Sequence, residues 1–534
     1  MLSINIMYIF LYSIVTILLG ALLVQNFIHS DNFELLSYRR IDDIAFQIVL
    51  NDIHKSILEL NFKNILSINN YSYGWIYWFP LALVTFPFHL IDSSISELAI
   101  ISIPRNASLF WEIGTLFIVY KIMFHFTQNK NISLFSMLSF ILFPTFGFYS
   151  SVFGTPSQIQ FFASLSIYLV LSVKEITPKN VSIIAFILAI ASATKITGLM
   201  ICPIIGLLLL KKMNFKLNMF NVKIMFIFTF VLISCWFILY NPFLVFSLFE
   251  ITIWNEFILN FSHGFSTINI NILENMSVLE KFKEGIAGYT LHYITILLLL
   301  SLFIFEVIIR YNNDEDYQTL LLIFIGLLII IIFLFFNVKH GLVYISNYFT
   351  ATNYLLLLGF IIFKRIDKVL FIPIITIVIS LNFYFNYSKF NHPQTGYFSF
   401  FYTIENSKKE QRLKEEIYIK LSKYKIDKNT KLNILREYNA LELFSSIRNN
   451  INQVVSFVNF HKVKDQLKYY DLILLNKSDN KLKVPIKTSR MNTKYINNLI
   501  KTKQFNDVKY EVIFENNTHL ILISNNIINK KGLK

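Results

Sequence analysis

Two adjacent carboxylates near the start of the chain are the residues best placed to do chemistry. Asp42 and Asp43 directly follow Arg39-Arg40-Ile41. A carboxylate crowded by a second carboxylate can have its pKa raised toward working pH, and it can then serve as a general base. The alternative is a solvated helix start, because aspartate is favoured in the first turn of a helix. The position of the pair in the chain helps to decide between a general base and a helix start.

The pair lies just beyond the first apolar run. Residues Ile4–Val24 are apolar over about 20 positions, which is the length of one transmembrane helix. The run lacks the small-residue cleavage site of a signal peptide, so we expect it to remain as a span. The stretch 25–73 would then be the first outer loop, and it would hold both carboxylates at the membrane surface.

The composition indicates a membrane protein. Of 534 residues, 55% are hydrophobic, 16% aromatic and 15% charged, and the mean hydropathy is +0.54. These values are typical of a polytopic α-helical membrane protein rather than a soluble enzyme with a large core. Cys202 and Cys235 both fall inside apolar runs, and we expect no disulfide. The net charge of +15 favours anionic lipid head groups or phosphate-bearing substrates as partners over nucleic acid.

Twelve apolar segments are candidate spans. After Ile4–Val24 they fall at Gly74–Ile91, Ser102–Phe126, Ile132–Ser150, Gln158–Val173, Val181–Thr194, Gly198–Leu210, Lys223–Phe246, Tyr289–Ile309, Thr319–Phe336, Tyr344–Phe363 and Val369–Phe385. The positive-inside rule places four short basic loops in the cytoplasm. They contain Lys121 with Lys130, Lys174 with Lys179, Lys211-Lys212 with Lys216, and Lys364-Arg365 with Lys368. An even number of spans separates each pair of these loops, which puts the loops near Gly154, Lys195, 249–288 and 337–343 outside.

One segment breaks the parity of this topology. Gly74–Ile91 cannot be a simple crossing if the first span runs outward and Ser102–Phe126 runs inward. It is short, contains Pro80 and Pro87, and begins in a cluster of Tyr and Trp typical of the membrane interface. Either this segment is re-entrant or a pair of helices lies around Arg105. We therefore expect about 11–13 transmembrane helices.

The composition changes near residue 391. Lys and Arg become frequent there, and the apolar runs shorten to strand length. Strands are expected at Leu432–Leu435, Val454–Phe457, Leu472–Leu475, Tyr510–Phe514 and Leu520–Ser524, with helices at Asn406–Lys425 and Tyr495–Lys503. The sequence thus predicts a multi-span domain over 1–390 and a small extracytoplasmic α/β domain over 391–534. The second domain has no Gly-rich phosphate loop and no His/Cys cluster, and we interpret it as an accessory or acceptor-binding domain.

The predicted topology collects polar residues on the outer side. They are Asp42, Asp43, Tyr71, Tyr73, Lys195, Glu256, His263, Lys339 and His340. Charged groups at the ends of membrane segments are costly, and they mark substrate paths more often than ordinary loops do. The acidic pair could supply a base for an acceptor hydroxyl, and Lys339-His340 could meet an anionic leaving group.

These positions also have simpler interpretations. Lys195 could snorkel to the interface at a helix break, as could Lys339-His340, and His263 could be an ordinary loop residue. Tyr71–Trp78 could be an interface belt. Asp314-Glu315-Asp316 resembles a metal-binding triplet, but it falls on the cytoplasmic side, where a solvated turn is expected.

The ordered set of motifs resembles the superfamily-C glycosyltransferases that use a polyprenyl-phosphate sugar, in particular the aminoarabinose transferase and protein O-mannosyltransferase group. In those proteins an acidic pair follows the first span and precedes a short amphipathic helix, as Asp42-Asp43-Ile44-Ala45-Phe46-Gln47 does here. Further segments follow in matching order over roughly residues 1–390. They are the aromatic segment Tyr71–Pro80, the break Thr194–Gly198, the loop from Asn241-Pro242 to His263-Gly264, and the loop from Lys339-His340 to Asn347-Tyr348.

Three positions depart from the family's pattern. Asp43 stands where the usual residue is Glu, Gln158 stands near the place of an acid in some relatives, and Asn347 stands where many have Arg. These departures bear on the identity of the donor and on some of its contacts.

The resemblance implies inverting transfer of a sugar from a polyprenyl-phosphate donor to a lipid, glycan or protein acceptor, at the outer face of the plasma or inner membrane. Asp42 aligns with the family's catalytic Asp and would act as the base beside Asp43. The donor phosphate would be met by Lys339, His340, Lys195 and Arg105. Substrate contacts would come from Tyr71, Tyr73, Glu256, His263 and Tyr348. His263 and Glu256 could hold a divalent metal, and no other cofactor is implied.

Three other classes remain open. A transporter or flippase of lipid-linked glycans would also be polytopic, although such proteins usually show internal repeats and paired broken helices, and this sequence shows no repeat. A polysaccharide polymerase or ligase would be expected to carry its large outer loop late in the chain. A catalytically inactive relative that binds lipid-linked glycans is the third alternative, and Gln158 and Asn347 are consistent with it.

Overall fold

The structure is a computed structural model that describes residues 13–26 in part, 41–66, 73–91, 93–141, 154–216, 218–243, 293–336, 354–366, 412–426, 430–437, 451–456, 470–476, 501–505, 507–517 and 519–530, with single residues between some of these ranges. For 41–48, 93–98, 293–294, 333–336, 436–437, 451–456, 476 and 530 it describes the backbone alone. The chain divides into two compact units. Met1–Phe27, Val49–Ile268 and Ser277–Phe400 form the first, and Ile28–Ile48, Asn269–Met276 and Phe401–Lys534 form the second.

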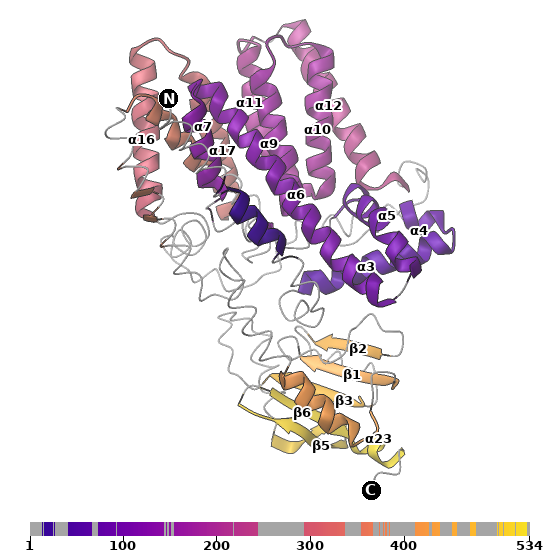
Figure 1. Ribbon diagram of the computed structural model, residues 1–534. Helices are drawn as coiled ribbons and strands as arrows, with labels where there is room; N and C mark the ends of the chain where they lie inside the picture. The colour runs from indigo at the N-terminus through magenta and orange to yellow at the C-terminus, as the bar shows by residue number, and fades with distance from the viewer. Residues whose placement is uncertain are drawn as a thin grey trace. The chain divides into compact units, whose positions relative to one another are not determined.

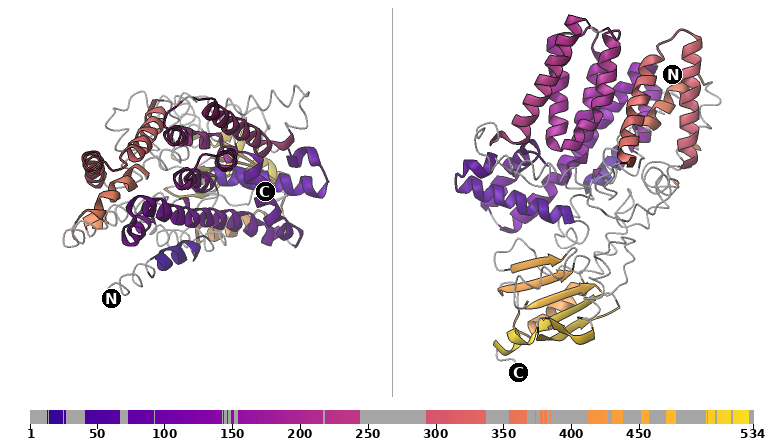
Figure 2. Two further views of the ribbon diagram at one scale, coloured as in Figure 1. Left: turned by 90° about the horizontal axis from the view of Figure 1, so that it is seen from above. Right: turned by 180° about the vertical axis from the view of Figure 1, so that it is seen from behind.

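The first unit is a bundle of helices (Figures 1 and 2). Its central helices are α6 (Ser93–Thr127), α9 (Pro156–Ser172), α10 (Pro178–Thr194) and α12 (Met219–Tyr240), which pack in that order. Beside them α11 (Cys202–Lys212) packs on α17 (Gln318–Phe336), and α16 (Tyr293–Asn312) packs on the 3-10 helix η3 (Gly359–Lys364). Further helices are α4 (Phe62–Leu66), α5 (Trp75–Ile91), α7 (Lys130–Ile141), the 3-10 helix η1 (Ile196–Ile201) and α3 (Ile41–Leu58), which belongs to this unit from Val49 onward.

Three described helices are long and apolar enough to cross a membrane. They are Ala99–Thr127 within α6, Met219–Tyr240, and Thr295–Asn312 within α16. Shorter apolar helices occur at Val15–Val24, Trp75–Ile91, Pro178–Thr194, Gln318–Ile332 and Tyr354–Lys364. Phe226 and Phe230 on α12 are among many large apolar side chains left exposed, as expected of helices that face lipid. The described part of the first unit therefore has the character of a membrane domain.

Local signals in the sequence fix where several helices begin. Thr177 accepts a hydrogen bond from the backbone N–H of Asn180, and Pro178 occupies the first position of α10, where its missing N–H costs nothing. Asn218 caps α12 in the same way, through the N–H of Asn221. The predicted spans Gln158–Val173, Val181–Thr194 and Thr319–Phe336 accordingly agree with α9, α10 and α17 to within a few residues.

Other predicted boundaries are wrong. A pair of helices around Arg105 is excluded, because Pro104 and Arg105 both lie inside the continuous helix α6. The predicted span Gly198–Leu210 does not begin as an α-helix, since Ile196–Ile201 is a 3-10 helix. The helix expected over Ile132–Ser150 ends at Ile141.

A buried carboxylate joins three helical segments at one end of the bundle. Glu306 on α16 is 1% exposed, and its two oxygens accept hydrogen bonds from the Arg310 Nε at 2.6 Å and the Arg365 Nε at 2.8 Å. Arg310 also donates to the backbone carbonyl of Phe126 near the end of α6, at 3.4 Å. Pairing with the two arginines offsets the cost of burying this carboxylate in its charged form.

The acidic triplet lies in a largely exposed turn at this end, as the sequence predicts, and two of its carboxylates form ion pairs. Glu315 forms an ion pair with Arg365 at 2.6 Å, and Asp316 forms one with Lys211 at 2.5 Å. Lys212 donates to the backbone carbonyl of Val173. These contacts bring the ends of α9, α11, α16 and η3 to one end of the bundle, as the predicted grouping of the basic loops requires.

The second unit contains a six-stranded sheet of order β2-β1-β3-β6-β5-β4. The strands are β1 (Leu432–Glu437), β2 (Ile451–Ser456), β3 (Leu472–Asn476), β4 (Gln504–Phe505), β5 (Val508–Glu515) and β6 (His519–Ser524). β1 pairs in parallel with β2 and β3, whereas the pairs β3–β6, β6–β5 and β5–β4 are antiparallel. The helix at 412–422 and α23 (Asn525–Lys530) cover one apolar face, and the other face packs against Leu499 and Phe505. The five predicted strands are present with small shifts, and the two-residue strand β4 was not predicted.

Candidate functional site at a helix break

The candidate site is built around the break between α10 and α11. α10 ends at Thr194, Lys195 is extended, and η1 follows at once. Gly198 permits the tight reversal, because a Cβ at this position would overlap the backbone carbonyl of Ala191. The break thus presents Lys195 at the carboxyl end of α10, where the helix dipole favours a cation.

A second segment lies against this break. Tyr73 and Lys195 form an isolated antiparallel bridge, and the Gly74 N–H donates to the Thr194 carbonyl at 3.2 Å. A side chain at Gly74 would overlap the Ala193 carbonyl and would come within 3.0 Å of the Tyr240 Cα. The glycine therefore allows the start of α5, the end of α10 and the end of α12 to meet.

The Lys195 side chain is enclosed by this contact. Its Nζ lies 3.5 Å from the Tyr73 hydroxyl and 4.8 Å from the centre of the Tyr73 ring. Lys195 is only 5% exposed, so the expectation that it snorkels out to the interface is wrong. An ammonium over an aromatic face gains about 0.5–2 kcal/mol, and more when it is desolvated. This offsets part of the cost of burying the charge.

Aromatic rings form the wall around the lysine. The Tyr77 and Trp78 rings lie 6.4 and 6.2 Å from that of Tyr73, and all three side chains are buried. The burial of these three rings within the protein differs from the lipid-facing position expected of an interface belt. Trp236 on α12 donates a hydrogen bond to the Ser192 carbonyl on α10 at 3.2 Å, which links these two helices.

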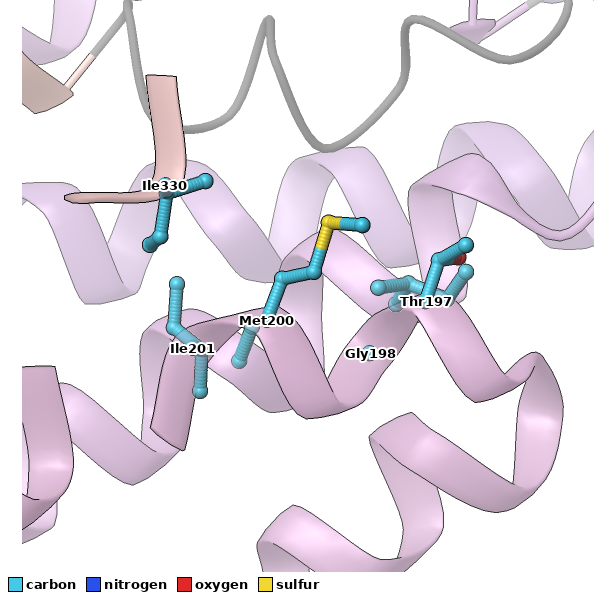
Figure 3. Close-up of a pocket in the computed structure, with 7 residues that line it drawn as sticks. Thr197, Gly198, Met200, Ile201 and Ile330 are labelled. Atoms are coloured by element: carbon cyan, nitrogen blue, oxygen red, sulfur yellow. The ribbon is translucent and has the colours of Figure 1, made fainter. Parts of the chain in front are cut away.

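A small pocket lies beside η1 (Figure 3). It has room for about one water molecule. Its walls are mostly apolar and come from η1, α9 and α17, with Thr197 as the polar member. The lining residues are Ile159, Ala163, Thr197, Gly198, Met200, Ile201 and Ile330. Thr197 Oγ1 is buried and has no hydrogen-bond partner within the described residues.

The acidic pair lies on an ordered helix. Asp42 and Asp43 occupy the first turn of α3, which agrees with both interpretations of the pair, a base and a helix start. The far end of α3 is held against α5, because the His54 Nε2 lies 2.9 Å from Thr85 Oγ1 and 3.2 Å from the Ala82 carbonyl. Burial, with a smaller effect of the nearby His89, lowers the pKa of His54 from 6.5 to about 4. His54 is therefore a neutral, structural residue at ordinary pH.

The other predicted site residues are distributed unevenly. Arg105 is buried within α6, at 3% exposure. Tyr71, Glu256, His263, Lys339, His340 and Tyr348 lie outside the described residues. Of the predicted set, the structure brings Tyr73 and Lys195 together. Among the residues it describes, no group of three or more His, Cys, Asp or Glu is placed to share a metal ion.

Sequence reasoning missed two buried acids, Glu306, described above, and Glu112. Glu112 lies near the middle of α6 with no exposed surface, and its Oε2 accepts a hydrogen bond from the Gln160 amide at 3.5 Å. In the described part of the chain no ion pair involves it. A lone acid inside a long apolar run was the available signal.

No protein-family model matches the chain, and no curated protein matches it.

Proposed function

We propose that the chain is a multi-span membrane glycosyltransferase, which moves a sugar from a polyprenyl-phosphate donor to a cell-envelope acceptor. The observation that carries the proposal is the buried Lys195 at a helix break, enclosed by Tyr73 and further aromatic rings. A cation held in such a water-poor site interacts strongly with an anion, because the surroundings screen it weakly. A lipid-linked phosphate is an anion that reaches such a site from within the membrane.

The proposed reaction is an inverting displacement at the sugar C1. Asp42 takes the proton of the acceptor hydroxyl while the acceptor oxygen forms a bond to C1, and the bond from C1 to the phosphate oxygen breaks. General-base catalysis contributes roughly 10²–10⁴ in rate. The polyprenyl phosphate leaves with the electron pair, and its charge is met by Lys195, with Lys339, His340 and Arg105 as further candidates. Positioning in a water-poor cavity supplies the rest of the acceleration.

The acidic pair and the orientation of the chain complete the proposal. Asp43 orients or tunes Asp42, and the active site and the C-terminal domain face away from the cytoplasm. Tyr71, Tyr73, Glu256, His263 and Tyr348 are the proposed substrate contacts. His263 and Glu256 are the residues that would hold a divalent metal. Removal of metal ions would then reduce turnover.

The decisive experiment is transfer of labelled sugar from a panel of polyprenyl-phosphate donors, in membranes that contain the full chain. We expect Asp42→Asn to abolish transfer and Asp43→Asn to reduce it less. Asp52→Asn is the matched control, because Asp52 is an exposed residue of the same helix α3 and should leave transfer unchanged. Full activity in Asp42→Asn would exclude the assignment of the base.

A second set of variants tests the anion site. Lys195→Met should raise the donor concentration needed for half-maximal rate, and Lys195→Arg should retain part of the activity because the charge survives while the geometry changes. Unchanged donor dependence in Lys195→Met would move the phosphate site elsewhere. If no donor supports transfer but vesicles containing the protein move lipid-linked glycans between leaflets, the chain is a flippase instead.

A further inference from the structure

The positive charge of this protein is concentrated in one part of the chain. Residues 401–534 contain 26 Lys and Arg against 13 Asp and Glu, whereas residues 1–400 contain 22 against 20. The final 134 residues therefore carry +13 of the net charge of +15. A net charge of this size creates a long-range field and attracts polyanionic surfaces.

Some of this charge lies at one edge of the C-terminal sheet, the edge formed by the starts of β1, β3 and β5 and the end of β6. Lys423 and Lys425 lie in the turn that ends the helix at 412–422, and Lys431 immediately precedes β1. Lys509 lies near the start of β5. All four side chains are exposed, and we call them the basic edge.

Hydrogen bonds and register show that Lys431 and Lys509 lie at the same end of the strands, and Lys423 and Lys425 precede Lys431 closely in the chain. The Asp471 N–H donates to the Asn433 carbonyl at 2.8 Å, which joins the starts of β1 and β3. The Ser524 N–H donates to the Asp471 carbonyl at 3.0 Å, and Ser524 is paired in register with Tyr510 at the start of β5. The Asp471 carboxylate is occupied as an acceptor for the Asn433 N–H, at 2.7 Å. It remains negatively charged and offsets one of the four positive charges.

The same surface carries an exposed apolar side chain. Ile419 is 65% exposed, and it lies one helical turn before Lys423 on the helix at 412–422. An isoleucine flanked by lysines suits a lipid interface, where the apolar group enters the boundary and the ammonium groups meet phosphates. A soluble polyanion would leave Ile419 in water. No glycine occurs between Gly396 and Gly532, which argues against the close backbone approach that a dinucleotide site requires.

We propose that the C-terminal domain docks through the basic edge and Ile419 onto anionic lipid head groups of the membrane that holds the rest of the chain. The covalent link to the apolar helices keeps the domain close to that surface, so each weak contact forms at high effective concentration. Each lysine near an anionic bilayer contributes about fivefold to the ratio of docked to free domain. The interaction does not depend on the proposed transferase activity.

The test uses the full chain with Cys202→Ser and Cys235→Ser, labelled with a polarity-sensitive dye at Ser422→Cys. It is reconstituted in nanodiscs of phosphatidylcholine alone or of phosphatidylcholine with phosphatidylglycerol. We expect the dye to report membrane contact in the anionic discs and to lose it at high salt, because screening weakens surface electrostatics. Equal signals in the two lipid compositions would overturn the proposal.

Charge variants supply the matched control. The triple variant Lys423→Glu, Lys425→Glu and Lys431→Glu should reduce docking by about 100-fold or more, whereas Lys423→Arg, Lys425→Arg and Lys431→Arg should retain it. Hydrogen exchange on the unsubstituted chain gives a second measurement that needs no variant. The amides of 419–431 should exchange more slowly in anionic discs than in zwitterionic ones, and identical exchange would also contradict the proposal.

Discussion

At the scale of single residues, Gly74 controls whether the candidate site can form. Its N–H bonds to Thr194, and it has no room for a Cβ beside the Ala193 carbonyl. We expect Gly74→Ala to lower the free energy of unfolding by about 1–3 kcal/mol, as overpacking usually does. Gly206→Ala is the matched control, because a Cβ there meets nothing within 4 Å, and a helix gains up to about 1 kcal/mol from alanine. Thermal unfolding in detergent measures the stability of both variants. Equal stabilities of Gly74→Ala and Gly206→Ala would contradict the inference that Gly74 has no room for a side chain.

Two buried glutamates should differ in how much they contribute to stability. Glu306 holds Arg310 and Arg365, whereas Glu112 has a neutral partner, the Gln160 amide. Glu306→Gln should cost about 3–5 kcal/mol, because it leaves two arginines without their shared carboxylate. Glu112→Gln keeps the shape and the hydrogen-bonding capacity, and should change stability by about 1 kcal/mol or less. Thermal unfolding of both variants distinguishes these outcomes, and a larger loss in Glu112→Gln would reverse the two assignments.

At the scale of elements, the packing of α3 on α5 should depend on pH. The pKa of His54 is near 4 in the folded protein, below its usual value of 6.5. Above pH 6.5 the imidazole is neutral in both states, and its contribution to stability is constant. As the pH falls from 6.5 toward 4 the unfolded chain takes up a proton that the folded protein resists, so stability is lost over this range.

The variant His54→Gln tests this dependence. Its amide can hydrogen-bond to Thr85 but does not titrate, so it should remove part of the loss of thermal stability between pH 7 and pH 5. A variant with the same pH profile as the parent protein would show that His54 is not responsible.

The elements also show how far the sequence could predict this fold. α9, α10 and α17 were predictable because each is an apolar run with a cap, a proline or a polar residue at its start. The enclosure of Lys195 was not, because it depends on a bridge to Tyr73, 122 positions away. β4 was missed because two residues give no periodicity. The ion pairs of the acidic triplet were missed because their partners lie on two other loops.

At the scale of the whole molecule, the orientation in the membrane governs the proposed chemistry. The basic loop at 211–216 should face the cytoplasm by the positive-inside rule, and the domain from residue 391 onward should lie outside. Its charge of +13 over 401–534 does not oppose this orientation, because long domains are translocated largely regardless of their charge. Lys212 contacts Val173, beside the basic loop at 174–179, while Lys211 and Arg365 both pair with the acidic turn, so these three basic loops should share one side of the membrane.

Single cysteines in a chain with Cys202→Ser and Cys235→Ser test this orientation on intact cells. An impermeant thiol reagent should label Ser478→Cys and should fail to label Asn218→Cys, which lies at the start of α12 beside the basic loop. Lysed cells are the control, because Asn218 is exposed and should react once the reagent can reach it. Labelling of Asn218→Cys but not Ser478→Cys on intact cells would invert the topology. The break at Lys195 would then face the cytoplasm, where a donor presented at the outer leaflet could not reach it.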